Sequence, residues 1–398
     1  MISVPFLNRS QLSDVRGTAR MAVDAADATA VVVEKMHRTI QTHPGPLGAS
    51  ASDGTRGITG LVYRSVRRGI RLVGRAIDAG LAPVAVLLPE GESTPARDAY
   101  RSAVNGVCGD YLLRTGNPLA IDMSLRFHGR PVNVHDPMSI FEQHSDETPA
   151  SKKLLVLAHG LCMNDRQWNR DGHDHGAALA QELGYLPLYL RYNTGVQISS
   201  NGQAFAELLE SMISNWTLPL EELAIMGHSM GGLVARSACH HGRVARHAWL
   251  KHLGKLVFLG TPHHGAPLER GGHGLEFVMD LSPYSMPLTR ISRARSAGIT
   301  DLRQGTVLAA QHDVPLPSGV KCYAAAAVRS AKRSTLSERL VGDGLVPLDS
   351  ALGQHRDTAR KLAIPKNHQW VGYRMGHGDL LSRPDVYAQI RSWLQQPA

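Results

Sequence analysis

The sequence has few aromatic residues and no pattern typical of nucleic-acid readers. Aromatic side chains make up 5% of the 398 residues, and neither a zinc-finger spacing nor an RNA-stacking motif occurs. The net charge of +9 still favours contact with an anionic surface. Without aromatic platforms or zinc ligands we expect no nucleic acid as partner, and phospholipid headgroups are the better candidate.

Long apolar runs and paired cysteines are also missing. No stretch of about 18 apolar residues occurs, so no helix is expected to span a membrane. The start, MISVPFLNRSQLSDVRG, holds no apolar stretch of signal-peptide length. The four cysteines stand apart without a C-x-x-C pair, and free thiols in a reducing compartment are the simplest account. We therefore expect a cytoplasmic protein, with peripheral association with a membrane left open.

The composition is that of a folded protein with one large core. Of the residues, 43% are hydrophobic and 19% are charged, which is typical of globular chains. No internal repeat is present, and the pattern changes from helical to alternating near residue 150. We predict a helical N-terminal extension over 1–118, of unassigned role, and a larger domain over 119–398 that opens with a β-hairpin around the HGRP turn.

A basic amphipathic helix is predicted over 60–81, within the extension. Such a helix can lie in a lipid interface, with its arginines on phosphates and its valines among acyl chains. It can instead pack against the larger domain and expose its basic face to water, and both interpretations stay open. The apolar positions are Val62, Val66, Ile70, Val73 and Ile77, and the basic ones are Arg64, Arg67, Arg68, Arg71 and Arg75.

From residue 151 onward, short apolar runs alternate with helical stretches such as 201–216 and 230–247. The runs are mostly apolar throughout, as in strands that are buried on both faces of a parallel sheet. The alternation of strand and helix predicts an α/β fold with an open sheet and right-handed crossovers. The runs are KKLLVLAHG, YLPLYLRY, EELAIMGHS, GKLVFLGTP and VKCYAAAAV.

Ser229 stands at a predicted strand-to-helix turn. The run LAIM precedes it, and SMGGLVARSACHH looks like the start of a helix. Gly227 and Gly231 give room for a strained turn and for close packing of the helix on the strand. This is the context of a nucleophile elbow, which exposes the serine hydroxyl above the carboxyl ends of the strands. We therefore predict that Ser229 is a nucleophile.

A serine nucleophile needs a base and an acid, which follow it along the chain in this arrangement. Asp343 lies in GDGLVP, and His377 lies in a glycine turn just before the last helical stretch. We assign His377 as the general base and Asp343 as the acid that orients its ring. Their separation of 34 positions along the chain leaves room for one strand and its connections. The competing residues, each in a less suitable setting, are His355, His368, Asp349 and Asp379.

An oxyanion hole needs two backbone N–H groups that point to one place. The residue after the nucleophile, Met230, supplies one of them. The loop after an earlier strand supplies the other, and His159-Gly160 follows the run LLVLA. We therefore predict the backbone N–H groups of Leu161 and Met230 as the two donors.

Taken together, these motifs resemble those of an α/β-hydrolase of the lipase and esterase group over residues 151–395. In particular the stretch is similar to bacterial lipases and to the GPI inositol-deacylase-like branch. The resemblance implies an α/β-hydrolase fold with a mostly parallel central sheet, and places the catalytic domain at 119–398. It also implies hydrolysis of carboxylic esters through an acyl-serine intermediate. The motifs are AHGL (158–161), GHSMGG (227–232), GTPHHG (260–265), GDGLVP (342–347) and GHGDLL (376–381).

Further expectations accompany this hypothesis. Residues 266–298 mix Leu, Phe and Met with Gly, Pro and Arg, and we predict a helical cap over the acyl pocket there. The stretch RDGHDHG (170–176) is interpreted as a polar surface loop rather than a metal site, and His263 and His264 are placed beside the active-site rim. We expect no cofactor and no metal. The alternative functions are an acyltransferase on the same triad and a non-catalytic protein that binds lipid surfaces.

Overall fold

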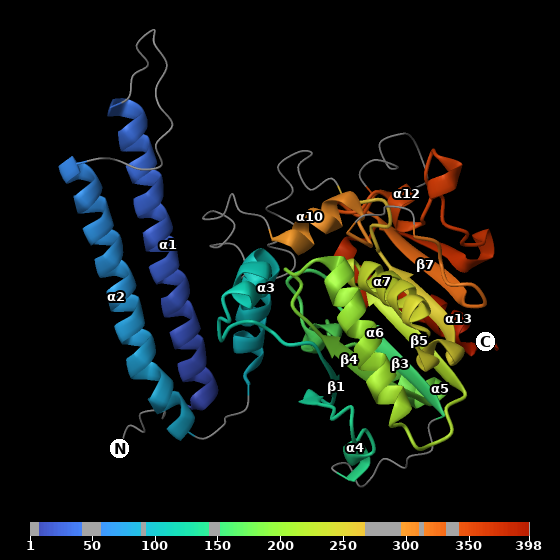
Figure 1. Ribbon diagram of the computed structural model, residues 1–398. Coiled ribbons are helices and arrows are strands. Elements are labelled where there is room, and N and C mark those ends of the chain that lie inside the picture. Colours follow the sequence, from blue (N-terminus) through green and yellow to red (C-terminus); the bar gives the residue numbers. More distant parts are fainter. Residues whose placement is uncertain are drawn as a thin grey trace. The chain divides into compact units, whose positions relative to one another are not determined.

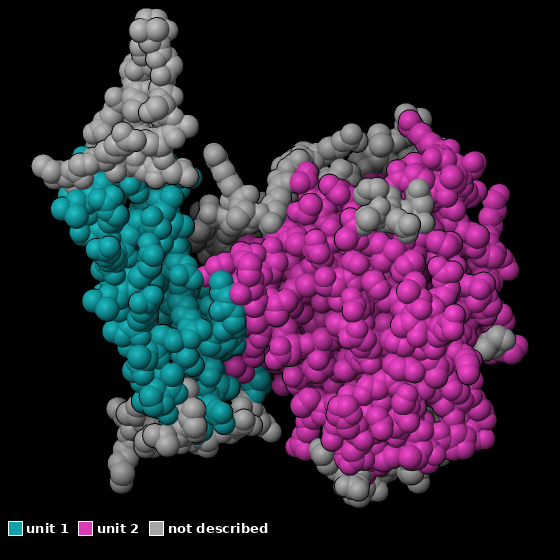
Figure 2. Space-filling view, viewed as in Figure 1, with its two compact units in different colours: residues 1–94, 115–119 teal, residues 95–114, 120–398 magenta. Residues whose placement is uncertain are grey.

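The computed structural model describes residues 8–41, 57–88, 93–142, 152–266, 296–309, 314–331 and 342–397. The chain divides into two compact units, shown in different colours in Figure 2: residues 1–94 with 115–119, and residues 95–114 with 120–398. The division into an extension that ends at 118 and a catalytic domain that begins at 119 stays a prediction.

The second unit is built on one eight-stranded sheet (Figure 1). The strands lie in the order β2-β1-β4-β3-β5-β6-β7-β8. All pairs from β4 to β8 are parallel, and only β1 pairs antiparallel with β2 and β4. The predicted α/β fold with a mostly parallel sheet is therefore confirmed. The strands are β1 (Ser124–Phe127), β2 (Arg130–Pro131), β3 (Lys153–Ala158), β4 (Tyr185–Arg191), β5 (Glu222–His228), β6 (Leu253–Leu259), β7 (Lys321–Val328) and β8 (Gln369–Tyr373).

The central strands are apolar because both of their faces are covered. Every residue of β5 is buried, as is every residue of β7 after its first. Along β3, Leu154 and Val156 pack into one apolar cluster, whereas Leu155 and Leu157 pack into another. A strand that is buried on both faces lacks the alternation of polar and apolar residues that is found where one face of a sheet meets water. All five predicted apolar runs form strands, and β8 is an additional strand that no run indicated.

The two apolar clusters identify which helices cover each face of the sheet. Helices α6 and α7 contribute to the first cluster and lie together on one face, whereas α5 and α13 contribute to the second (Figure 1). The α-helices of the unit are α3 (Pro95–Arg114), α4 (Ser139–Glu142), α5 (His175–Leu183), α6 (Ile198–Ser214), α7 (Met230–Ala245), α10 (Ala297–Gln304), α12 (Leu348–Ala351) and α13 (Pro384–Gln395). The 3-10 helices are η1 (Asp165–Trp168), η2 (Ala248–Lys251), η3 (Thr358–Arg360), η4 (Lys366–His368) and η5 (His377–Leu381).

The first unit is a helical hairpin of α1 (Arg9–Gln41) and α2 (Gly57–Leu87), which lie side by side (Figure 1). Ion pairs join the two helices where they contact each other. Arg20 donates to Asp78 from both Nε and Nη2, at 2.6 and 2.5 Å. Arg67 donates to Asp27 in the same bidentate way, at 2.9 and 3.1 Å. Ion pairs therefore form part of the contact between α1 and α2.

The predicted apolar stripe of α2 is present, but most of it is exposed. Val62, Val66 and Val73 are 53%, 48% and 57% exposed. Ile70 is only partly exposed, and Gly74 faces Val23 of α1 so closely that a Cβ there would lie 2.6 Å from a valine methyl. The stripe thus flanks the helix contact instead of forming it, because glycine and ionic side chains occupy the contact itself. None of the helices in the described ranges combines the length and hydropathy that a bilayer crossing requires.

The predicted cap over 266–298 falls almost wholly outside the described residues. Its described ends are Ala266, which is buried, and the start of α10, where Ser296 caps the helix by accepting from the Ile299 N–H. The cap therefore stays a prediction.

Candidate active site

Ser229 sits at a sharp turn between β5 and α7. Its backbone has φ 53° and ψ −121°, a region that costs a non-glycine residue about 1–3 kcal/mol. The Ser229 N–H donates to the Leu259 carbonyl at 2.8 Å, and its own carbonyl accepts from Gly232 at 3.1 Å. The surrounding structure therefore holds a strained serine at the carboxyl end of the central strand, as a nucleophile elbow requires.

The glycines around Ser229 are required by close backbone contacts. A Cβ on Gly231 would lie 2.1 Å from the Ala158 carbonyl oxygen, and one on Gly227 would lie 2.4 Å from the Gly232 nitrogen. A Cβ on Gly160 would lie 3.1 Å from the Ser229 Cβ. The start of α7 and the loop after β3 are thus pressed together around the serine.

His377 and Asp343 form a buried hydrogen-bonded pair. His377 Nδ1 lies 2.6 Å from Asp343 Oδ2, and both side chains are almost fully buried. The other carboxylate oxygen accepts from the backbone N–H groups of Leu345 and Val346, at 2.9 and 2.8 Å. Because an ionised carboxylate only accepts, Nδ1 carries the proton and Nε2 is left as the basic nitrogen. His377 Nε2 has no hydrogen-bond partner among the described residues.

The predicted triad residues come from three strands that end at the same edge of the sheet. Ser229 follows β5, Asp343 follows β7 after an intervening segment, and His377 follows β8. His377 also lies against the elbow: its ring centroid is 4.7 Å from that of His228, the residue before the serine. A Cβ on Gly260, just after β6, would lie 2.8 Å from His377 Cε1. The structure therefore gathers the serine, the histidine and the carboxylate in one region.

The predicted oxyanion donors lie on the two backbones that meet at Ser229. Met230 is the first residue of α7, and Leu161 follows the His159-Gly160 exit from β3. No hydrogen bond from either N–H is found in the part of the chain that the structure describes. Two unengaged donors beside a strained serine suit the stabilisation of a developing oxyanion.

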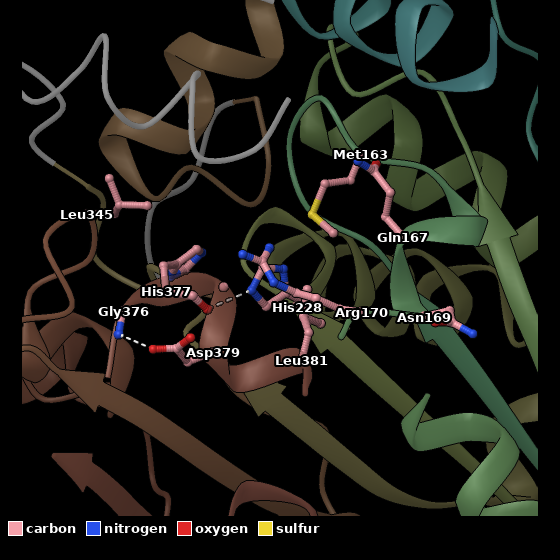
Figure 3. Close-up of a pocket in the computed structure, with 11 residues that line it drawn as sticks. Met163, Gln167, Asn169, Arg170, His228, Leu345, Gly376, His377, Asp379 and Leu381 are labelled. Atoms are coloured by element: carbon pink, nitrogen blue, oxygen red, sulfur yellow. Dashed lines mark hydrogen bonds between the residues drawn. The ribbon is translucent and has the colours of Figure 1, made fainter. Parts of the chain in front are cut away.

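A cavity of about 310 Å³ opens over the histidine (Figure 3). Its lining includes His377, His228, Met163, Gln167, Arg170 and Leu345. The mixture of apolar and polar side chains suits a small organic substrate, with polar groups that orient it.

The other histidines at the site are held neutral by burial. Burial lowers the pKa of His228 well below its ordinary value, and the nearby His377 lowers it further. Burial also lowers the pKa of His159 to about 4, and its ring stacks on Tyr192 at 4.5 Å. Neither residue adds a positive charge near the basic nitrogen of His377 at neutral pH.

The competing residues make other contacts. His368 precedes β8, five residues of strand away from the end that leads to His377, and its Nδ1 lies 3.2 Å from the Cys322 carbonyl at the start of β7. Asp379 accepts from the Gly376 N–H at 2.8 Å, which caps the turn that carries His377. The His355 ring lies tilted against that of His264, with ring centroids 4.9 Å apart. Asp349 lies in α12, while Asp343 holds the histidine.

The stretch 170–176 forms a turn and a helix start. Asp174 caps α5 by accepting from the Ala177 N–H at 3.0 Å, and it accepts from the Tyr189 hydroxyl at 2.7 Å. His263 is buried and contacts Arg236 and Phe258. No group of three or more metal-ligating side chains is found within the described ranges.

Part of the chain matches a known protein family. Residues 153–340 match the family model described as the PGAP1-like alpha/beta domain. The match includes Ser229 and ends before Asp343 and His377, so those two residues rest on the geometry above. Among curated proteins no sequence match is found.

Solved structures of bacterial and archaeal hydrolases are similar to the chain. A mature lipase of Bacillus licheniformis shares 16% identity, covering 69% of this chain and 97% of that one, with a TM-score of 0.43. An esterase of Pyrococcus furiosus shares 12% identity, covering 62% and 83%, with a TM-score of 0.36. A lipase-esterase related protein of Clostridium acetobutylicum shares 12% identity, covering 62% and 95%, with a TM-score of 0.34. The family match over residues 153–340 confirms the predicted resemblance to an α/β-hydrolase domain of the GPI inositol-deacylase-like kind.

Proposed function

We propose that this α/β-hydrolase-like chain is a serine esterase that cleaves carboxylic esters through an acyl-serine intermediate. The observation that carries the proposal is the buried pair of His377 and Asp343, beside a serine held at φ 53° between β5 and α7. A structural serine has no need of strained backbone, and a structural histidine has no need of a buried carboxylate that fixes its tautomer.

The mechanism follows from the positions of these groups. His377 Nε2 removes the hydroxyl proton of Ser229, and the serine oxygen attacks the ester carbonyl. Asp343 stabilises the imidazolium cation that forms, through the 2.6 Å contact with Nδ1. The backbone N–H groups of Leu161 and Met230 receive the negative charge of the tetrahedral intermediate. His377 then protonates the leaving alcohol and later activates the water that releases the acid.

Replacing Ser229 tests the proposal. Ser229→Ala is expected to abolish turnover of p-nitrophenyl esters and labelling by a fluorophosphonate probe, while the thermal unfolding temperature stays near that of the parent. Turnover retained by this variant would refute the role of Ser229. An acyltransferase would be recognised in the same assay by transfer of the acyl group to added alcohols in place of its release as the acid.

We also propose that the hairpin of α1 and α2 makes peripheral contact with an anionic lipid surface. Some of its charged residues pair between the helices, as Arg20 does with Asp78, while apolar residues of α2 face outward, as Leu72 does at 68% exposure. Arg68 and Arg75 are exposed on the same helix. An outward face that combines apolar and cationic side chains matches acyl chains and lipid phosphates together.

Vesicle sedimentation tests this contact. We expect stronger binding to vesicles with anionic lipid than to neutral ones, and weaker binding after the double change Leu72→Gln and Val73→Gln. Val244→Gln is the matched control, because Val244 is an equally exposed apolar residue on α7. Equal binding by the double variant and the control would exclude this surface.

A further inference from the structure

Arg170 lies in the wall of the cavity that opens over His377. It lines that cavity together with His377 and His228 (Figure 3). Its guanidinium rests on the backbone of Gly378, where a Cβ would lie 2.7 Å from both Arg170 Cζ and Nη1. The absence of a side chain at 378 therefore lets a cationic group lie flat against the residue that follows His377.

The segment that carries Arg170 is tied to the segment that carries His377. The backbones of Arg170 and His173 exchange two hydrogen bonds of 2.9 Å, which close a tight turn. His173 Nε2 lies 2.8 Å from His175 Nδ1, and His175 Nε2 lies 3.0 Å from the Leu380 carbonyl in η5. The position of the arginine is thus set by a chain of contacts that ends three residues after His377.

Two acidic groups around Arg170, Asp171 and Asp379, also have other hydrogen-bond partners. The Asp171 carboxylate is 3.8 Å from Arg170 Nε, is itself 74% exposed, and accepts from the Ser382 hydroxyl at 2.9 Å. Asp379 also lines the cavity, but it accepts from the Gly376 N–H at 2.8 Å. The Arg170 side chain is 39% exposed. Its positive charge is therefore not neutralised by a close buried carboxylate, and its N–H groups are accessible from the cavity.

The side of the ester that would meet Arg170 follows from the reaction. Because His377 must protonate the leaving alcohol, the alcohol part of the substrate lies against His377. Arg170 contacts Gly378, the next residue, and so faces the alcohol part and not the acyl chain. A guanidinium binds phosphate or carboxylate through two parallel N–H···O bonds.

We propose that Arg170 selects esters whose alcohol part carries an anionic group, either a phosphate or a carboxylate. This rests on the proposed esterase activity and adds a class of substrate to it. The residue acts in specificity, and the bond that breaks is still the carboxylic ester.

Matched pairs of soluble esters test the proposal. Monobutyrylglycerol and monobutyrylglycerol phosphate share one scissile bond and differ in the phosphate; butyryloxyacetamide and butyryloxyacetate form the corresponding carboxylate pair. We expect the wild type to favour the charged member of at least one pair, and Arg170→Gln to lower the ratio of kcat/KM, charged over neutral, by about tenfold. The loss should appear mainly in KM, because the contact is made in the ground state as well.

Three further variants separate the effects of the bidentate geometry, of the position of the guanidinium and of the overall charge of the protein. Arg170→Lys keeps the cation but not the bidentate geometry, and should show an intermediate ratio. Gly378→Ala should push the guanidinium from its place and lower the ratio without removing the charge, since Gly378 has no φ in the left-handed region. Arg243→Gln removes an exposed arginine from the last turn of α7, roughly 20 Å along the helix from Ser229, and should leave the ratio at its wild-type value.

Calorimetric binding of glycerol 3-phosphate and of glycolate to the wild type and to Arg170→Gln separates this proposal from the esterase activity itself. If no ester is cleaved but one of these anions binds more weakly to the variant, the anion site stands and the esterase proposal fails. If esters are cleaved and the ratios and anion affinities are the same in wild type and Arg170→Gln, the role of Arg170 is refuted. Equal losses in Arg170→Gln and Arg243→Gln would also refute it, because they would reflect overall charge.

Discussion

The change of Asp343 to asparagine separates the orienting role of this side chain from its structural role. The carboxylate makes three contacts: one oxygen accepts from the N–H groups of Leu345 and Val346, and the other meets His377 Nδ1. An asparagine can keep its carbonyl oxygen on the two backbone donors. Its NH₂ group must then face His377, because that is the only orientation that leaves the backbone bonds intact.

The size of the effect follows from the tautomer of His377. An amide NH₂ donates, so the ring nitrogen that faces it must accept, and the proton moves to Nε2. A protonated Nε2 cannot remove the proton of Ser229. In a serine triad this error lowers kcat by about 10⁴, or ~5.5 kcal/mol of activation free energy. Stability should change little, because the two backbone hydrogen bonds remain.

Asp343→Ala gives the opposite combination of readouts. It removes all three contacts and leaves two buried N–H groups without partners, each at a cost of about 1–3 kcal/mol. Turnover should therefore fall together with the free energy of unfolding. Asp379→Asn is the matched control, since it changes a nearby carboxylate that caps the turn and does not contact the His377 ring.

Two measurements check this: p-nitrophenyl ester hydrolysis, and the rate of fluorophosphonate labelling of Ser229, which needs no knowledge of the natural substrate. Chemical denaturation reports the stability of each variant. If Asp343→Asn keeps more than about a tenth of the labelling rate, against the loss of about 10⁴ expected from a wrong tautomer, the carboxylate does not orient His377. An equal loss in Asp379→Asn would refute the assignment as well.

Two further predictions concern stability. Burial lowers the pKa of His175 from 6.5 to about 4. As the pH falls, the unfolded chain therefore binds a proton at this residue before the folded chain does. The contribution of His175 to the free energy of unfolding is complete above pH 6.5 and falls by about 1.4 kcal/mol per pH unit toward pH 4. For His175→Gln, the free energy of unfolding obtained from denaturation curves should depend less steeply on pH over that range. An unchanged pH dependence would contradict the lowered pKa of His175. Lys255 is buried and donates to both oxygens of Glu222, at 2.9 and 3.0 Å. Lys255→Met should therefore cost about 3–5 kcal/mol, and Lys255→Met with Glu222→Gln should cost less; equal costs would mean that no uncompensated charge is left behind.

The fold and the proposed catalytic residues were accessible from the sequence because they obey local rules. Buried parallel strands are apolar throughout, so runs such as LLVLA and LAIM stand out. The order of serine, acid and base along the chain then restricts the choices downstream. The hydrogen bond between His377 and Asp343 agrees with that order. The strand β8 was harder to detect, because QWVGY is only partly buried and mixes polar with apolar residues.

In the hairpin of α1 and α2, the spacing of apolar residues does not predict which residues are buried. A stripe of valines at helical spacing predicts a buried face, and yet Val62 and Val73 are more than half exposed. The face of α2 that contacts α1 instead carries Gly74 and two ion-paired residues. Arg67 of α2 donates to Asp27 of α1, and Asp78 of α2 accepts from Arg20 of α1. Spacing alone cannot distinguish an apolar face that meets another helix from one that meets a lipid surface, since both are periodic in the same way.

Arg170 was hidden for a different reason. It precedes an Asp-Gly turn in a stretch whose polar composition is typical of a surface loop. Only Asp171 and Gly172 of that stretch are exposed, whereas His175 and Gly176 are buried at the start of α5. What gives the arginine its position is a set of contacts over more than 200 residues, from His175 to the carbonyl of Leu380 and from the guanidinium to Gly378. The proposed triad could be inferred because each member lies in its own motif. A residue that selects the substrate needs only to face the site, and no local pattern records which way a loop faces.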